Sequence, residues 1–377
     1  MRFLIAPDKF KGSLAAQAVG QSIASGIADV CADAEVEIVS LADGGEGTAE
    51  AIYSAIGGEW VNCVAHDALS REIKARYLSL AQTKTVVIEM SEAAGLHRLA
   101  EGERDPLRAS TFGVGEMMRD ALRLEPREII VGLGGSATND GGIGMARALG
   151  YRFFAGEREL TDGPVDLLEL RRIETPGAAV LAGPRQKITA AVDVQNPLLG
   201  KHGATRVFGP QKGVTPEQIP LLERALTTLA NVAARDLGRD FRDTAGAGAA
   251  GGLGFGLLAF GDAELRSGFA VVAAAMRLEE KIARADFVIT GEGRLDSQTL
   301  QGKGPAGLAA LARKLNKPVC AIVGEVADPA AEALFDRVAV LARPPITRTI
   351  AIERTSELLR ERAQEIARFY FQAEKAE

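Results

Sequence analysis

The chain has 377 residues, of which 47% are hydrophobic and 25% charged, an ordinary composition for a soluble globular protein. This length exceeds what one hydrophobic core usually serves, so we expect two domains. The formal net charge of −6 argues against general binding to nucleic acids or anionic membranes, because both need a basic surface.

Export and membrane insertion are not expected from this sequence. Three separated cysteines, Cys31, Cys63 and Cys320, suit a reducing compartment rather than a disulfide framework or a metal knuckle. The N-terminus MRFLIAPDKFKG carries charges where a signal peptide needs its apolar core, so we expect a cytoplasmic protein. The longest uncharged run, TAGAGAAGGLGFGLLAFG, is too rich in glycine for a lipid-facing helix, which favours a glycine-rich loop followed by a buried helix.

The N-terminal segment predicts the start of a parallel α/β sheet. The apolar run RFLIA (residues 2–6) predicts a strand that ends at Pro7. Ser13 has the character of an N-cap for a helix formed by LAAQAVGQSIASGIADV. The alternating run EVEIVS (35–40) predicts the next strand, which gives a strand–helix–strand order.

The middle of the chain has a different rhythm. Residues 71–80 and 83–90 predict two adjacent antiparallel strands. A helix from about Ser110 follows, then strands in REIIVGLGG and KITAAVDV and a long helix near residues 216–237. The strand–helix alternation of the N-terminus returns near the C-terminus: ADFVIT, PVCAIV and RVAVLA predict strands, while GPAGLAALARKL and TSELLRERAQEIARFY predict helices.

We therefore expect the two ends of the chain to fold together. Residues 1–66 and 285–377 would form a discontinuous flavodoxin-like domain with a five-stranded, doubly wound parallel sheet, and residues 67–284 a larger inserted mixed α/β domain. Ligands of such sheets bind at the carboxyl ends of the strands. The interdomain cleft is the expected active site.

Polar segments that contain glycine follow five of the predicted strands, and two of these segments carry a cation suited to an anionic ligand. APDKFKGS places Asp8 and Lys11 before a helix, where free amides and the helix dipole favour an anion. TGEGRLDSQT offers Arg294, which can grip a carboxylate or phosphate with two parallel hydrogen bonds. A solvated turn and a surface ion pair are the ordinary alternatives. The second segment also contains Glu292, Asp296 and Ser297.

ADGGEGT and GLGGSATNDGG combine glycines with polar side chains. In the first, Asp43 and Glu46 lie close together, and like charges repel unless a cation, a metal or a shared proton lies between them. In the second, backbone amides and the hydroxyls of Ser136 and Thr138 resemble a phosphate cradle in kind, although no P-loop or dinucleotide fingerprint is present. A capping carboxylate and a flexible turn are the alternatives.

The fifth segment, AVDVQNPLLG, places Asp193 and Asn196 at the end of an apolar strand, where the carboxylate is either a cap or a reacting group. No metal-ligand spacing of histidines, Cys–His arrangement or G-x-S-x-G motif marks another chemistry. Anion receptors, acids and hydroxyls without a covalent nucleophile suit phosphoryl transfer, which depends on positioning and on charge neutralisation with Mg²⁺.

Eight segments occur in a fixed order along the chain: IAPDKFKGSL, ADGGEGT, STFGVGE, GLGGSATNDGGIGMARALG, DVQNPLLG, FGPQKG, GAGAAGGLGFGLLAF and GEGRLDSQTLQGK. Together they resemble the signature of the bacterial glycerate kinase family (type 1, glycerate 2-kinase). Lys9 departs from the family pattern, which has Ser there, while Lys11 matches it.

The resemblance implies an enzyme that uses ATP and Mg²⁺ to phosphorylate D-glycerate, mainly to 2-phosphoglycerate. The residues alone leave three alternatives open: the 3-hydroxyl, another small hydroxy acid, and a non-catalytic ligand-binding regulator on the same scaffold. They determine neither the oligomeric state nor the domain that holds the nucleotide.

The site residues expected on this basis fall into four groups. Asp193 would act as the base and Lys11 would neutralise phosphate charge. Arg294, with Asp8 and Asn196, would hold the substrate. Phosphate would bind at Gly134, Gly135, Ser136 and Thr138, and Mg²⁺ at Asp43 and Asp296.

Overall fold

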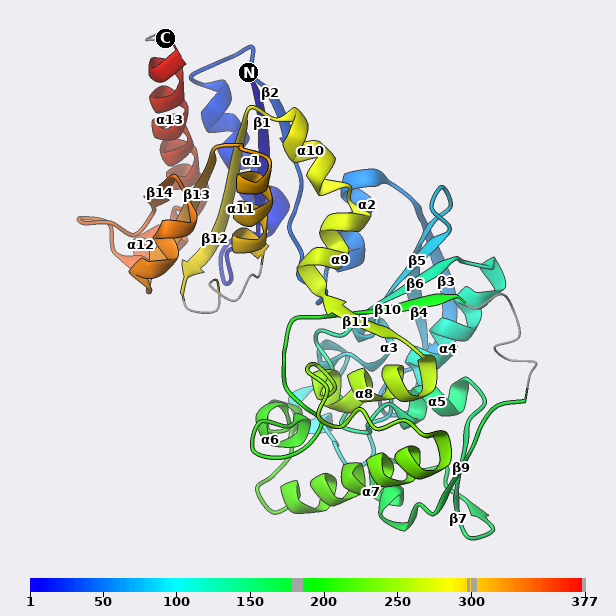
Figure 1. The fold of residues 1–377 in the computed structure, drawn as a ribbon. Coiled ribbons are helices and arrows are strands. Elements are labelled where there is room, and N and C mark those ends of the chain that lie inside the picture. Colours follow the sequence, from blue (N-terminus) through cyan, green and yellow to red (C-terminus); the bar gives the residue numbers. More distant parts are fainter. Residues whose placement is uncertain (178–185, 297–298, 300–303, 375–377) are drawn as a thin grey trace. The chain divides into compact units, whose positions relative to one another are not determined.

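A computed structural model describes residues 1–177, 186–296, 299 and 304–374 and divides the chain into two compact units (Figure 1). Unit 1 is assembled from both ends of the chain and unit 2 from the middle. Unit 1 comprises Met1–Asp43, Glu50–Ile56 and Phe269–Glu377, and unit 2 comprises Gly44–Ala49 and Gly57–Gly268.

Unit 1 contains a five-stranded sheet in the order β2-β1-β12-β13-β14, in which every pair is parallel. The two N-terminal and three C-terminal strands therefore form one sheet, as the sequence predicts, and their order is that of a flavodoxin-like fold. The strands are β1 (Arg2–Pro7), β2 (Glu35–Ile38), β12 (Phe287–Leu295), β13 (Val319–Val326) and β14 (Arg337–Val340).

Helices cover this sheet because successive strand residues point to opposite faces. Phe3 and Ile5 of β1 share a core with α1 (Ala16–Ala28) and α13 (Thr355–Glu374). Helix α11 (Gly304–Lys314) contacts β1, β12 and β13. Ser13 is not the N-cap expected from the sequence: α1 begins after Ala15, and the Ser13 hydroxyl instead donates to Thr355 Oγ1 at 2.6 Å.

Unit 2 contains a six-stranded mixed sheet in the order β11-β10-β6-β5-β4-β3. The four strands from β11 to β5 are parallel, and β4 pairs antiparallel with both β5 and β3. The predicted antiparallel pair is thus confirmed as β4 and β5. The strands are β3 (Glu59–His66), β4 (Glu72–Leu80), β5 (Thr85–Glu89), β6 (Glu128–Gly132), β10 (Lys187–Val192) and β11 (Glu264–Ser267).

The unit boundaries differ from the expected domain boundaries at three places, the first of which is Gly44–Ala49, a short segment that belongs to unit 2. Strand β3 pairs with β4 along its whole length, so residues 59–66 belong to unit 2 rather than to the N-terminal segment of unit 1. Helix α9 (Gly268–Ala275) and helix α10 (Leu278–Arg284) belong to unit 1 almost entirely, and α10 contacts β1 and α11. Strand pairing and helix packing decide these boundaries, and neither is visible in the local sequence pattern.

The helices of unit 2 include the two expected from the sequence, α4 (Phe112–Ala121) and α7 (Ile219–Leu237). Helix α8 (Ala249–Gly261) is the apolar, glycine-rich run, and nearly all of its residues are buried. Among the described residues, no helix has both the length and the apolar character needed to cross a membrane. Unit 2 also contains α3 (Ser91–Ala94), α5 (Ile143–Ala148) and α6 (Ala204–Phe208), whereas α12 (Arg348–Glu353) and most of α2 (Thr48–Ile56) belong to unit 1.

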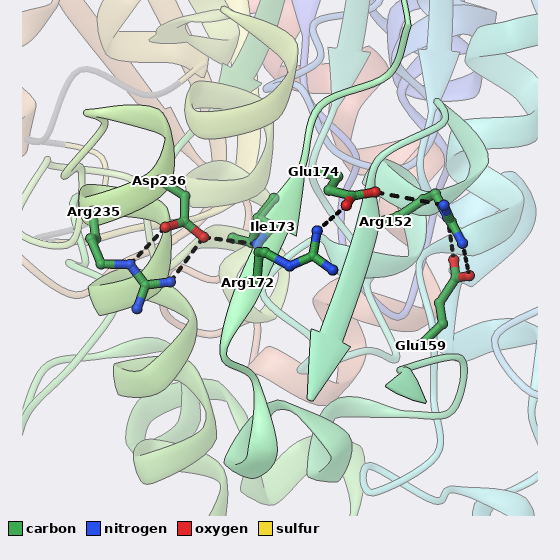
Figure 2. A network of polar contacts seen from close by, with 7 residues as sticks. All are labelled: Arg152, Glu159, Arg172, Ile173, Glu174, Arg235 and Asp236. Atoms are coloured by element: carbon green, nitrogen blue, oxygen red, sulfur yellow. Dashed lines mark hydrogen bonds and ion pairs between the residues drawn. The ribbon is translucent and has the colours of Figure 1, made fainter. Parts of the chain in front are cut away.

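A small antiparallel sheet in unit 2, not expected from the sequence, consists of β7 (Arg152–Ala155), β8 (Arg158–Glu159) and β9 (Arg172–Glu174). Figure 2 shows the polar contacts that fix it: Asp236 of α7 accepts a hydrogen bond from the Ile173 backbone amide at 2.8 Å. Arg152 of β7 pairs across the strands with Glu159 of β8 and with Glu174 of β9. The other two ion pairs are local: Arg172–Glu174 lies within β9 and Arg235–Asp236 within α7.

Candidate functional site

Unit 1 has a hollow of about 350 Å³ at the carboxyl ends of its central strands. β1 and β12 remain paired up to this edge, where the Asp8 amide donates to the Gly291 carbonyl at 2.8 Å. Parallel strands thus bring together segments that are nearly 300 residues apart in the chain. Five of the predicted site residues line the hollow: Asp8, Lys11, Asp43, Arg294 and Asp296.

Two carboxylates of the hollow, Glu292 and Asp8, have raised pKa values. Burial raises the pKa of Glu292 to about 7, and the negative charges of Asp8 and Asp296 act in the same direction. The Thr299 hydroxyl opposes this effect by donating to Glu292 Oε1 at 2.7 Å. Burial also raises the pKa of Asp8, with a further contribution from the charge of Asp43. The hollow therefore favours a cation or a proton among its acids.

Two guanidinium groups flank one carboxylate on the same wall. Arg294 Nε lies 3.5 Å from Glu325 Oε1, and Arg348 Nε lies 3.7 Å from Glu325 Oε2. Arg294 Nε is also 4.0 Å from Asp296 Oδ2, which is the ion pair that sequence analysis weighed as the ordinary alternative. Because both arginine side chains are more than half exposed, these pairs contribute little to stability and leave the guanidinium groups accessible.

Four further residues line the hollow that have no role among the sequence predictions: Glu292, Glu325, Arg348 and Thr299. Glu325 is the next-to-last residue of β13 and comes after the apolar run PVCAIV, so its position near a strand end is a usable signal in the sequence. Arg348 comes from the start of α12, and no local pattern distinguishes it from other surface arginines. Ser297 lies outside the described residues.

Unit 2 places three polar groups at the carboxyl ends of adjacent parallel strands. Gly132 at the end of β6 pairs with Ala191 of β10 on one side and with Glu89 of β5 on the other. The glycine-rich loop begins directly after Gly132, and Asp193 lies two residues after Ala191. The loop and the half-buried Asp193 therefore leave the sheet side by side.

Glu89 connects this edge to the ADGGEGT segment, most of which belongs to unit 2. Its carboxylate accepts hydrogen bonds from the amides of Gly47 at 3.1 Å and Ala49 at 2.7 Å. Sequence analysis missed this residue, although it ends an apolar strand. Burial raises its pKa, and the two backbone donors oppose the shift.

The glycines of the loop are required by close approach and by backbone conformation. A Cβ atom on Gly134 would lie 2.4 Å from the Cα of Gly45, so the two glycine segments touch backbone to backbone. Gly135 has φ +71°, a conformation that side-chain-bearing residues rarely adopt. The close approach at Gly134 and the positive φ at Gly135 together explain why this turn contains consecutive glycines.

Three successive amides of the loop are free to bind an anion. Among the described residues, the N–H groups of Gly134, Gly135 and Ser136 donate no hydrogen bond, while Leu133 N donates to Ala191 O and Ala137 N donates to Ala94 O. A run of unpaired amides in a turn is a typical phosphate receptor. Ser136 itself is 8% exposed.

The structure describes the surroundings of two further predicted site residues, Thr138 and Asn196, whose roles stay predictions. Thr138 is completely buried, and its hydroxyl has no hydrogen-bond partner in the described part of the chain. The Asn196 side-chain amide donates one hydrogen bond to the His202 carbonyl at 2.7 Å, which helps to fix the local turn. Its second N–H and its amide oxygen are left for a substrate.

Parallel sheets whose carboxyl ends carry unpaired amides, acids and cations define an α/β enzyme for anionic substrates. Comparison with known proteins identifies the family of enzymes. The family model described as "Glycerate kinase family" matches residues 3–371. The chain therefore belongs to the glycerate kinase family, and it is a kinase.

The relatives agree along most of the chain. It is 43% identical over 332 residues to a protein named glycerate 2-kinase from Escherichia coli K12, covering 87% of this chain and 86% of that one. A glycerate kinase from Halalkalibacterium halodurans is 40% identical over 97% of both chains. A crystal structure from Salmonella typhimurium LT2, provisionally named glycerate kinase 2, aligns with TM-score 0.86 at 41% identity, covering 100% of this chain and 99% of that one.

Proposed function

We propose that the protein transfers the γ-phosphoryl group of ATP to the 2-hydroxyl of D-glycerate, giving 2-phosphoglycerate and ADP in the cytoplasm. One observation carries the phosphate-binding part: three unpaired amides follow β6 directly, beside the carboxylate that follows the neighbouring strand β10. The names of the relatives supply the acceptor, and one of them specifies the 2-position.

In this reaction the substrate hydroxyl oxygen forms a bond to the γ-phosphorus while the bond to the bridging oxygen of ADP breaks. Asp193 accepts the proton of the hydroxyl group or orients that group. A base positioned in this way typically accelerates a reaction by about 10²–10⁴-fold. The amides of Gly134, Gly135 and Ser136 bind phosphate oxygens, and Lys11 neutralises phosphate charge. Arg294, with Asp8 nearby, holds the glycerate carboxylate.

The described residues fit a magnesium ion that arrives with the nucleotide. They contain no group of three His, Cys, Asp or Glu side chains that could form a metal cage. Mg²⁺ commonly uses only one or two carboxylates, with phosphate oxygens and water as its other ligands. Asp43 and Asp296, which line the same hollow, would supply those carboxylates. When bound, the ion would neutralise charge on the transferred phosphoryl group.

One assay tests the proposal. The protein is incubated with ATP, Mg²⁺ and D-glycerate, and ³¹P NMR locates the phosphate on the product. We expect 2-phosphoglycerate and one equivalent of ADP. Formation of 3-phosphoglycerate would reject the proposed position, and turnover of another hydroxy acid in preference to D-glycerate would reject the proposed substrate. Lactate, which lacks the second hydroxyl, is a suitable comparison.

The role of Asp193 is tested separately by Asp193→Asn. The amide keeps the size of the side chain but cannot accept the proton, so we expect kcat to fall by about 10²-fold or more while substrate binding stays within a few-fold. Single-turnover kinetics at saturating ATP measures the chemical step. Near-normal turnover of the variant would remove Asp193 from the role of base.

A further inference from the structure

Three of the eight family segments have no role in the proposed reaction: STFGVGE, FGPQKG and GAGAAGGLGFGLLAF. All three contact residues 138–145 within unit 2, which are the second half of the glycine-rich loop and the first residues of α5. The free amides of the loop lie in its first half, at residues 134–136. Because the two halves of the loop are continuous, contacts that fix its second half also constrain the amides at residues 134–136.

STFGVGE supports the loop through Thr111 and Asp140. The buried Asp140 carboxylate accepts hydrogen bonds from the Thr111 amide and hydroxyl, both at 2.8 Å. It also accepts from the amides of Gly142 at 3.0 Å and Gly144 at 3.2 Å. The Thr111 hydroxyl in turn accepts from the Met145 amide at 2.9 Å. These bonds fix the end of the loop and the start of α5.

The glycine-rich segment of α8 supports the loop by close backbone contact. The Gly141 amide donates to the Gly251 carbonyl at 3.1 Å. A Cβ atom on Gly251 would lie 1.9 Å from the carbonyl oxygen of Thr138, and the residue has φ +68°. Neither the space nor the conformation admits another residue here.

FGPQKG contributes a buried amine. Lys212 ends the short helix η5 (Pro210–Lys212) and is 1% exposed. Its Nζ donates to the Thr138 carbonyl at 2.6 Å, the one hydrogen bond that it makes among the described residues. The hydroxyl of Thr138 and Oδ1 of Asn139, also buried, have no partner there. The polar groups behind the loop are thus only partly satisfied.

A buried amine with one hydrogen bond is a poor source of stability. Burial lowers the pKa of Lys212 to about 7, with the charge of Asp140 opposing the shift, which reports how unfavourable the charged form is at this position. An apolar side chain of similar length would fill the same volume without this desolvation cost. Stability of the fold therefore does not account for a lysine at this position, whereas the hydrogen bond from its amine to the Thr138 carbonyl does.

We propose that Lys212 is a positioning residue, whose amine holds the Thr138 carbonyl and thereby fixes the amides of Gly134, Gly135 and Ser136 in a phosphate-binding orientation. The inference rests on the proposed function of the loop. Thr138 lies two residues after Ser136, and Ala137 between them is held by Ala94. Without the hydrogen bond from Lys212, the Thr138 carbonyl at the C-terminal end of this short segment loses its side-chain donor.

Lys212→Met tests the proposal because it preserves the length of the side chain and removes the donor. We expect a folded variant that binds ATP and ADP at least about tenfold more weakly by calorimetry, with KM for D-glycerate at saturating ATP within about threefold of the wild type. Val232→Ala is the matched control: it removes buried volume from α7 elsewhere in unit 2 and should lower the melting temperature without changing nucleotide affinity.

The outcomes separate the inference from the proposed function. If wild-type protein turns over D-glycerate and Lys212→Met binds ATP within twofold of it, the positioning role is wrong while the function stands. Weakened ATP binding in proportion to lost thermal stability, matched by Val232→Ala, assigns Lys212 a purely structural role and also overturns the inference. A wild-type chain that does not bind ATP rejects the proposed function, and the inference with it.

Discussion

Glu292 illustrates how one residue can report on the chemistry of the unit 1 hollow. Its pKa of about 7 arises first from burial and then from the neighbouring charges of Asp8 and Asp296. A carboxyl group that titrates near neutrality is poised to respond to a cation or an anion entering the hollow. In the protein without ligand, the protonation of Glu292 can be followed through the pH dependence of the free energy of unfolding.

Glu292→Gln is expected to change the pH dependence of stability. With a pKa raised from 4.5 to about 7, Glu292 contributes stability in its protonated form below pH 4.5, and that contribution is lost as pH rises to about 7. Glutamine cannot ionise, so the variant should gain about 1–3 kcal/mol over the wild type between these pH values, at about 1.36 kcal/mol per pKa unit. Urea denaturation at pH 5 and pH 8 measures the gain, and an equal difference at both values would contradict it.

Arg294→Lys tests a cationic side chain of the same hollow. A forked donor becomes a point charge, so we expect KM for D-glycerate to rise about tenfold with kcat changed much less. Steady-state kinetics at saturating ATP measures both constants. Arg343→Lys is the control, since Arg343 pairs with Glu365 on the surface and does not line the hollow. An unchanged KM would show that Arg294 does not contact the substrate.

At the scale of the elements, the contact between α1 and α13 depends on one small residue. A Cβ atom on Gly26 would lie 2.3 Å from the Arg360 carbonyl oxygen and 2.8 Å from Ala363 Cβ. In an open helix, glycine to alanine is favourable by up to about 1 kcal/mol, but here the added methyl group must push two helices apart. Overpacking therefore outweighs helix propensity.

Gly26→Ala should lower the free energy of unfolding by about 1–3 kcal/mol. Ser25→Ala, at the exposed neighbouring position, should change it by less than about 0.5 kcal/mol. Chemical denaturation of both variants supplies the comparison. Equal stability of Gly26→Ala and the wild type would mean that the helices adjust without cost.

The elements that sequence analysis predicted are those whose pattern is local. Alternating or continuous apolar runs mark β1, β6, β10 and β13 because burial on a sheet imposes them. The strand β3 was missed because it is an edge strand with a largely exposed, mixed pattern. The three short strands β7, β8 and β9 lack a periodic signal of their own and are held by the paired charges of Figure 2.

For the whole molecule, the two units have separate hydrophobic cores. One contains residues of α1, α13 and the five-stranded sheet, and the other residues of α4, α7, α8 and the six-stranded sheet. Separate cores favour separate cooperative units, although the chain passes between them several times. That loops of both units serve one active site stays a prediction.

Hydrogen exchange can test whether the cores are independent. In Gly26→Ala, we expect faster exchange for the backbone amides of β1 and β12 in unit 1, while protection of β6 and β10 in unit 2 stays within about twofold. Mass spectrometry of peptides from these strands resolves the two units. Equal acceleration in both would indicate that the whole chain unfolds as one cooperative unit.

The sequence by itself determined the class of the fold, the parallel sheet built from both chain ends and the family, because these depend on apolar periodicity and on motifs that are contiguous in the chain. Only the tertiary structure decided where unit 2 begins and that Thr138 is buried. It also decided that Glu325 and Arg348 line the hollow and that Lys212 is buried against the Thr138 carbonyl. The reason is physical: burial, pKa shifts and hydrogen-bond partners depend on residues brought together from distant parts of the chain, and no local pattern records those neighbours.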